Sequence, residues 1–295
     1  MAIKLSISTG VIQQKFGDKK TLEMAAAAGF DAVDLDVQCY GKGILPNIYD
    51  MPEEEFRAYF TDLKQYADQL GIRFSQTHNL VDAFTPDAAY NRRLALIAKR
   101  GIEATAILGT PYTVFHCIST FQWGYGVPDA VMHEQNQKMY EEFIPYAEKH
   151  GVNITLESFG RVTVGGVKGF DHFADPVKML RELEDMPTKN KAFCVDSGHA
   201  HAAASGEYPD VAKHIRQFKD YIRILHLHDN NGQSDQHLLP GQGTINWKET
   251  FDALKEIGYD GYYNYELSMN PFVDCMEDMI LFLGKYLRKF TEKYV

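Results

Sequence analysis

Residues 223–229 read Arg-Ile-Leu-His-Leu-His-Asp, a short run in which apolar and polar side chains alternate. Leu225 and Leu227 hold one set of alternate positions, and His226 and His228 hold the other. Successive side chains of a β-strand point to opposite faces, so the run predicts a strand with one apolar and one polar face. In a barrel the apolar set meets the surrounding helices and the polar set faces inward.

Short β-branched or aromatic runs of this kind recur along the chain. Stretches of helical period separate them, and Gly or Asn stands at many of the joins, which is typical of repeated βα units. The second run shows the same split, with Asp34 and Asp36 on its polar face. Eight units close a (β/α)8 barrel. The eight predicted strands are 4–9, 32–37, 73–79, 112–118, 153–158, 191–197, 223–229 and 261–267.

Helices are expected between the strands. The clearest candidates are 53–70, 87–108, 130–150, 211–221, 247–257 and 276–294. The chain has 295 residues, of which 45% are apolar, and no linker, low-complexity tract or charge block interrupts it. We therefore expect an α/β protein, with residues 1–295 forming a single TIM-barrel domain.

The composition narrows the class of partner and the compartment. Lys and Arg number 30 against 40 Asp and Glu, giving a formal net charge of -10 that argues against nucleic acid as a partner. The four cysteines form no Cys-x-x-Cys pair, which favours a reducing cytoplasm. No apolar signal core or membrane-length run is present. We expect a cytoplasmic protein with no membrane partner.

Strand parity gathers chemistry-bearing side chains on one face, near the carboxyl ends of the strands, where barrel enzymes carry their active sites. A single His or Glu at a strand end is more often a hydrogen-bonded structural residue. Several carboxylates buried together, however, are costly unless a cation or protons neutralise them, and this favours a metal ion. The residues concerned are His78, His116, Glu157, Asp196, His226 and Glu266.

The preferred ligands are one from each of the last four strands: Glu157, Asp196, His226 and Glu266. His228 is the main rival of His226, because the two share parity. Oxygen and imidazole donors suit one divalent ion of manganese, magnesium, cobalt or zinc, without choosing among them.

The chain resembles the xylose-isomerase-like barrel superfamily, which includes sugar isomerases and epimerases, inosose dehydratases and zinc-dependent AP endonucleases. The resemblance covers essentially the whole chain, and the superfamily ligand at the start of a His-x-x-Asp segment favours His226 over His228. The motifs that carry it are LES at 156–158, DSGH at 196–199, HLHD at 226–229, DQH at 235–237, PGQGTINW at 240–247 and YE at 265–266.

The resemblance implies a metal-dependent isomerase or epimerase acting on a sugar, sugar phosphate or cyclitol. Glu157 and Glu266 would remove and return a proton through an enediolate, and loss of hydroxide instead would give an inosose-type dehydratase. Further residues would bind substrate or support the ligands by hydrogen bonds. These are His78, His116, His199, Asp235 and His237.

Departures from the superfamily patterns leave alternatives open. Gly232 and Thr163 stand where ketose 3-epimerases have Arg and Glu, and His228 stands where inosose dehydratases often have Lys. The nine candidate ligand and substrate-binding residues also match the residue types of the three-zinc site of the AP endonucleases, but the acidic balance favours carbohydrate. A barrel that binds without turnover stays open. Exposed aromatics such as Tyr125 leave a homo-oligomer open.

Overall fold

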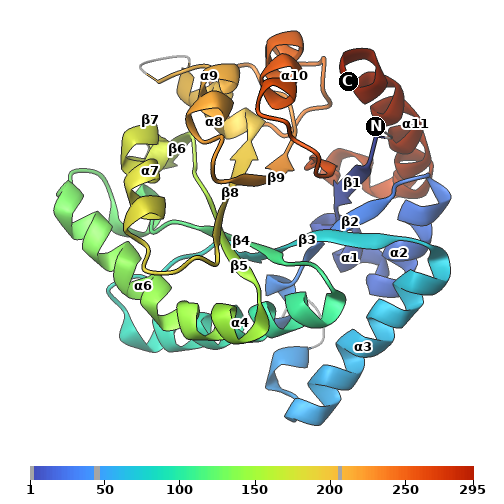
Figure 1. Cartoon of the computed structure of the whole chain (residues 1–295), viewed down its shortest axis with the longest axis horizontal. Coiled ribbons are helices and arrows are strands. Elements are labelled where there is room, and N and C mark those ends of the chain that lie inside the picture. The colour runs from blue at the N-terminus through green and yellow to red at the C-terminus, as the bar shows by residue number, and fades with distance from the viewer. Residues whose placement is uncertain (1–2, 43–46, 205–207) are drawn as a thin grey trace.

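Eight parallel strands form the centre of the molecule, as the alternating runs predict (Figure 1). The computed structural model describes residues 3–42, 47–204 and 208–295. In spatial order the strands are β10 (Tyr263–Tyr265), β1 (Leu5–Ser8), β2 (Ala32–Asp36), β3 (Arg73–Leu80), β4 (Tyr112–His116), β5 (Asn153–Glu157), β8 (Lys191–Asp196) and β9 (Ile222–His226). A parallel bridge between Leu227 and Tyr265 joins β9 to β10, so the sheet is an α/β TIM barrel.

Helices surround this sheet, and the predicted ones are present. Glycines in the left-handed conformation, Gly71, Gly109 and Gly151, end three of the longest at the expected residues. One predicted helix is too long: it was expected over residues 211–221, but it ends at Gln217. The helices are α1 (Gly10–Phe16), α2 (Asp18–Ala27), α3 (Glu53–Leu70), α4 (Ala88–Leu108), α5 (Thr120–Trp123), α6 (Asp129–His150), α7 (Pro176–Asp185), α8 (Ser197–Ala204), α9 (Val211–Gln217), α10 (Trp247–Glu256) and α11 (Met276–Tyr294).

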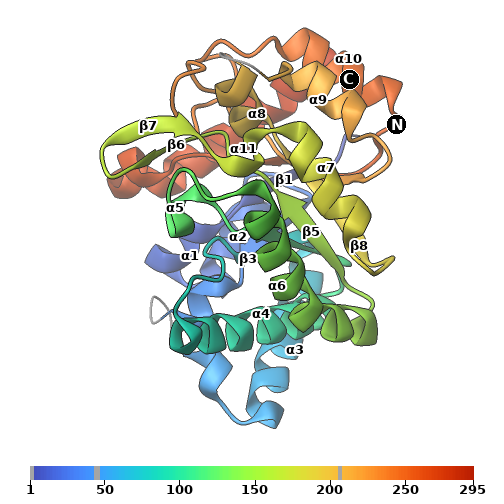
Figure 2. The same ribbon diagram turned by 90° about the vertical axis from the view of Figure 1, so that its left-hand side faces the viewer.

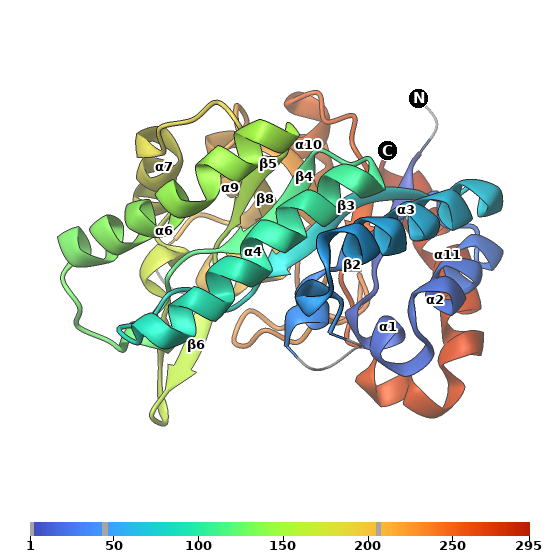
Figure 3. The ribbon, with the colours of Figure 1, turned by 90° about the horizontal axis from the view of Figure 1, so that it is seen from below.

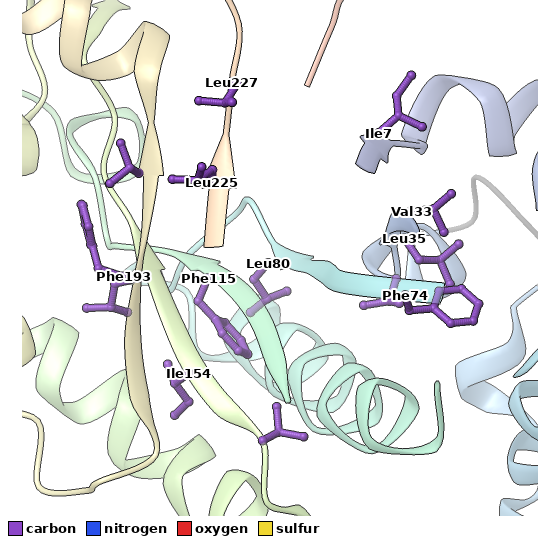
Figure 4. Packing of buried hydrophobic residues seen from close by; sticks show 14 of the residues in the cluster. Ile7, Val33, Leu35, Phe74, Leu80, Phe115, Ile154, Phe193, Leu225 and Leu227 are labelled. Carbon is purple, nitrogen blue, oxygen red and sulfur yellow. The ribbon is translucent and has the colours of Figure 1, made fainter. Parts of the chain in front are cut away.

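The strands divide their side chains between two environments. Val33, Phe115, Phe193 and other apolar members are buried between sheet and helices (Figure 4). Polar members meet in the barrel interior, where the hydroxyls of Ser6 and Ser75 lie 2.7 Å apart. A small apolar group of Val114, Cys194 and Ile224 lies apart from the main core. The sulfur of Cys194 also lies within 4.8 Å of ligand atoms of Glu157 and His226.

A β-hairpin that is not among the predicted strands follows β5. Its strands, β6 (Arg161–Val164) and β7 (Val167–Phe170), pair antiparallel outside the barrel sheet and project from it (Figures 2 and 3). Gly165 and Gly166 both have positive φ, which is what a tight two-residue hairpin turn requires. None of the helices in the described part of the chain is long and apolar enough to cross a membrane.

Candidate metal centre

Four side chains converge where the last four barrel strands end. Glu157, Asp196 and His226 are the final residues of β5, β8 and β9, and Glu266 follows β10 directly. His226 Nδ1 lies 3.0 Å from Glu157 Oε2 and 3.2 Å from Glu266 Oε2. One ligand atom from each of the four residues lies within 4.8 Å of every other. The predicted ligands thus come together in one cluster.

The spacing and the missing hydrogen bonds of this cluster suit a cation. Ligand atoms about 2.1 Å from one ion stand roughly 3.0–3.4 Å from one another. Glu157 is 1% exposed, and neither of its carboxylate oxygens has a hydrogen-bond partner among the described residues. His226 Nδ1 also lacks one. Because buried polar atoms are normally paired, these atoms fit the donor set of a divalent ion.

Asp34 holds the other side of the His226 ring. His226 Nε2 lies 3.0 Å from Asp34 Oδ2, so a proton on Nε2 donates to this carboxylate and leaves Nδ1 as a lone-pair donor. Ser8 Oγ also donates to Asp34, at 2.9 Å. The sequence places Asp34 on the inward face of β2 but gives no sign of this contact, which spans 192 positions of the chain.

A second group of side chains lies beside the first and includes three of the predicted substrate-binding residues. Asp235 Oδ2 lies 3.3 Å from His199 Nε2 and 3.1 Å from His237 Nε2. His228 Nε2 lies 3.0 Å from Asp196 Oδ1, which joins the two groups. His199, His228, Asp235 and His237 also offer ligand atoms within 4.8 Å of one another. His228 therefore belongs to this neighbouring group, and His226 to the first.

Backbone constraints position the second group. A Cβ built on Gly198 would stand 1.9 Å from His228 Cε1, so no other residue type fits at that position without moving the ring. His237 has a φ of 47°, which is strained for a residue other than glycine. Its Nδ1 lies 3.0 Å from the backbone carbonyl oxygen of Glu266, and this contact holds the ring in place.

His78 and His116 form a third group around the carboxylate oxygen of Glu157 that His226 also approaches. Their Nε2 atoms lie 3.8 Å and 3.5 Å from Glu157 Oε2. The two rings stack on each other, and Phe159 stacks on His116 with ring centroids 4.2 Å apart. All nine predicted ligand and substrate-binding residues thus lie in three adjoining groups. Glu157 connects the first group to the third, and Asp196 connects the first to the second.

Charges in the groups shift several pKa values. Burial alone would raise the pKa of Glu157, but the neighbouring histidines, His226 and His116 foremost, together outweigh it and hold that pKa well below its usual range. Burial would likewise lower the pKa of His237, but its hydrogen bond to Asp235 raises it to about 9. Burial lowers the pKa of His116 to about 3. Burial raises the pKa of Asp36, in the adjoining wall, to about 6. Without an ion, the negative charge of the carboxylates is balanced by protons on the histidines whose pKa values are raised, such as His237.

An open cavity of about 560 Å³ borders the groups. His199 and Asp235 lie on one side of it, and Phe121 and Phe159 give it an aromatic wall. Trp123 donates its Nε1 proton to the carbonyl oxygen of Phe84, 2.9 Å away. Phe121, which is 52% exposed, is the aromatic side chain that borders the opening.

The glycine-rich turn at 240–247 is arranged by Asp229. The buried carboxylate accepts hydrogen bonds from the backbone amides of Gly241 and Ile245, at 2.8 and 3.1 Å, and from Trp247 Nε1, at 2.9 Å. Gly241 has a φ of 90°. These amides are occupied by Asp229, so the turn leads into α10 and does not offer them to a phosphate.

Comparison with known proteins agrees with this architecture. A sequence model described as xylose isomerase-like TIM barrel matches residues 22–280. The chain belongs to the xylose isomerase-like TIM barrel family. Among solved structures, the IolI protein with a binding zinc atom has a TM-score of 0.79 at 20% identity, with 99% of each chain covered. A D-tagatose 3-epimerase-like protein has a TM-score of 0.71 at 22% identity, covering 99% of this chain and 100% of its own. At these identities the likeness is one of fold.

Curated relatives match at slightly higher identity but over less of the chain. Fructoselysine 3-epimerase of Shigella flexneri is 26% identical over 223 residues, 71% of this chain and 76% of the relative. Inosose isomerase of Bacillus velezensis is 23% identical over 271 residues, 90% and 88% of the two chains. An uncharacterised protein of Methanocaldococcus jannaschii is 35% identical, but the match covers only 45% of this chain and 43% of that protein.

Proposed function

We propose that the chain is a divalent-metal-dependent isomerase or epimerase of a sugar, sugar phosphate or cyclitol. The observation that carries the proposal is the convergence of His226 Nδ1 with the carboxylates of Glu157 and Glu266, 3.0 and 3.2 Å away. The ion would be held by Glu157, Asp196, His226 and Glu266. When bound, a divalent ion supplies positive charge that stabilises an enediolate.

The two glutamates divide the proton transfer in this proposal. Glu157 is almost fully buried, whereas the side chain of Glu266 is 22% exposed and borders a small cavity with Ser8 and His78. Glu157 and Glu266 flank the same space, so one can take a proton from a carbon and the other can return it. The low pKa of Glu157 keeps it ionised and able to accept a proton.

The surroundings and the relatives support the proposed substrate class. The aromatic side chains of Phe121 and Phe159 offer an apolar face to one side of a sugar ring or chain, while the surrounding histidines and carboxylates match its hydroxyls. Named relatives include an epimerase of a sugar derivative and an isomerase of a cyclitol derivative, which makes the chain an enzyme of this broad kind. A small carbohydrate or cyclitol is the proposed partner.

The test is proton exchange at carbon. Metal-loaded protein is incubated in deuterium oxide with a panel of ketoses, aldoses, their phosphates and inososes, and NMR follows loss of C–H signals. We expect exchange with at least one compound, and a loss of about 1,000-fold or more in Glu157→Gln, because the base is removed. Glu184→Gln, an exposed substitution on α7, is the control and should keep wild-type exchange. Exchange that persists in Glu157→Gln contradicts the assignment.

A three-ion phosphodiesterase is the second candidate, because the groups around His78 and His116 and around His199 and Asp235 could hold ions of their own. DNA would need cations around the opening, and the hairpin segment beside it carries only Arg161 and Lys168. Cleavage of abasic duplex DNA, with no exchange in any sugar, would favour this candidate.

A further inference from the structure

A second hollow lies at the opposite end of the barrel, where the strands begin. Its volume is about 670 Å³. Residues at the starts of β3, β4 and β9, including Arg73, Tyr112 and Ile222, line it together with Lys4 and Tyr262, which precede β1 and β10. Small-molecule sites commonly measure roughly 300–1,000 Å³. Because all the groups described above lie at the carboxyl ends of the strands, this hollow is separate from them.

The charge of this hollow is opposite to that of the chain. Acidic residues outnumber basic ones by 40 to 30 in the whole sequence. The lining of the hollow contains a single carboxylate, Asp260, and five cations, which are Lys4, Lys64, Arg73, Lys219 and Arg223. A positively charged hollow on a negatively charged protein raises the local concentration of anions.

Three of the five cations are free of carboxylate partners. Asp68 Oδ2 lies 2.5 Å from Lys64 Nζ, and Asp68 Oδ1 lies 3.2 Å from Arg73 Nη1, so Asp68 partly neutralises these two. Lys4 donates only to the carbonyl oxygen of Asp260, and Arg223 only to that of Ile222. Among the described residues, Lys4, Lys219 and Arg223 form no ion pair with a carboxylate.

The wall between these cations is mixed and includes aromatic rings. Tyr112, Tyr259 and Ile257 line the hollow, together with polar residues such as Gln76 and Thr110. Isolated surface lysines usually form a solvated face, but here they surround a concave wall that contains tyrosine rings. The combination suits a ligand with an anionic head and a flat apolar body. Arg and Lys bind phosphate through charge-assisted hydrogen bonds.

We infer that the hollow at the amino-terminal end of the barrel binds a nucleoside phosphate. The phosphates lie among Lys4, Lys219 and Arg223, and the base packs against the tyrosine side of the wall. The site is independent of the proposed isomerase activity, since it shares no residue with the metal centre.

Calorimetric titration of the full-length protein at low salt tests the site, with ADP, adenosine and inorganic phosphate as the probes. We expect ADP to bind about tenfold or more tightly than adenosine or phosphate, since it engages both the cations and the wall. The double variant Lys219→Gln/Arg223→Gln should weaken ADP binding at least about tenfold. Lys213→Gln/Lys248→Gln makes the same charge change near the other ends of α9 and α10 and should leave it within about twofold.

Three results would overturn the inference. They are no detectable binding of ADP, equal ADP affinity in wild type and Lys219→Gln/Arg223→Gln, and phosphate binding as tight as ADP. Glu157→Gln separates this site from the metal centre. It should bind ADP as wild type does even if no sugar ever exchanges a proton.

Discussion

Asp34 shows how one residue can set the chemistry of another. Its carboxylate accepts the Nε2 proton of His226, so that Nδ1, which faces Glu157 and Glu266, can give its lone pair to a bound ion. A carboxylate behind a ligand histidine fixes the tautomer and makes the ring a better donor. Parity in the sequence predicts that both residues face inward. Their contact depends on closure of the barrel, which brings β2 and β9 across the interior.

We expect Asp34→Asn to lower the affinity for Mn²⁺ or Zn²⁺ by roughly 10–100-fold, because a neutral amide supports the ring less strongly. Competition with a fluorescent chelator measures it. Asp62→Asn, an exposed site on α3 paired with Lys19, is the matched control and should bind as wild type does. Unchanged affinity in Asp34→Asn would remove Asp34 from the centre.

Single elements illustrate which parts of the fold a sequence discloses. The strand and helix bounds agree within a few residues, since alternation and helical period are local patterns. None of the predicted strands covers the hairpin of β6 and β7, although the pair Gly165–Gly166 between Val-containing segments is a usable signal. The clamp by Asp229 on the turn at 240–247 could not be foreseen, because its partners lie 12 to 18 positions away.

We expect Asp229→Asn to lower the free energy of unfolding by about 3 kcal/mol, because the amide group would face backbone and indole donors in place of a carboxylate oxygen. Urea unfolding followed by circular dichroism measures this. Asp252→Asn on α10 loses only an exposed ion pair with Lys248 and should cost less than about 1 kcal/mol. Equal losses in the two variants would contradict the clamp.

At the scale of the whole molecule, charge balance couples the stability of the metal-free protein to pH. In the metal-free protein, the proton on His237 is held by Asp235, which raises the pKa of His237 to about 9 from an ordinary value of 6.5. A raised pKa stabilises the folded state fully below pH 6.5, and this stabilisation is lost as the pH rises through 9. Metal-free protein should therefore become less stable across this window.

Thermal unfolding of metal-free protein between pH 6 and pH 10 checks this expectation. His237→Asn, which tolerates the positive φ at that position, should show a flatter dependence on pH between about 6.5 and 9. An equal slope in wild type and His237→Asn would mean that other groups govern the pH dependence.

The central claim is that one divalent ion lies among Glu157, Asp196, His226 and Glu266. Native mass spectrometry of the purified protein, after incubation with Mn²⁺, Co²⁺ or Zn²⁺ and removal of the excess, tests it most directly. We predict about one tightly held ion per chain. The double variant Glu157→Gln/His226→Gln should hold none, because the two remaining ligands, Asp196 and Glu266, are too few to bind an ion tightly. No retained ion would contradict the metal centre, and three would contradict the sugar assignment in favour of the three-ion phosphodiesterase.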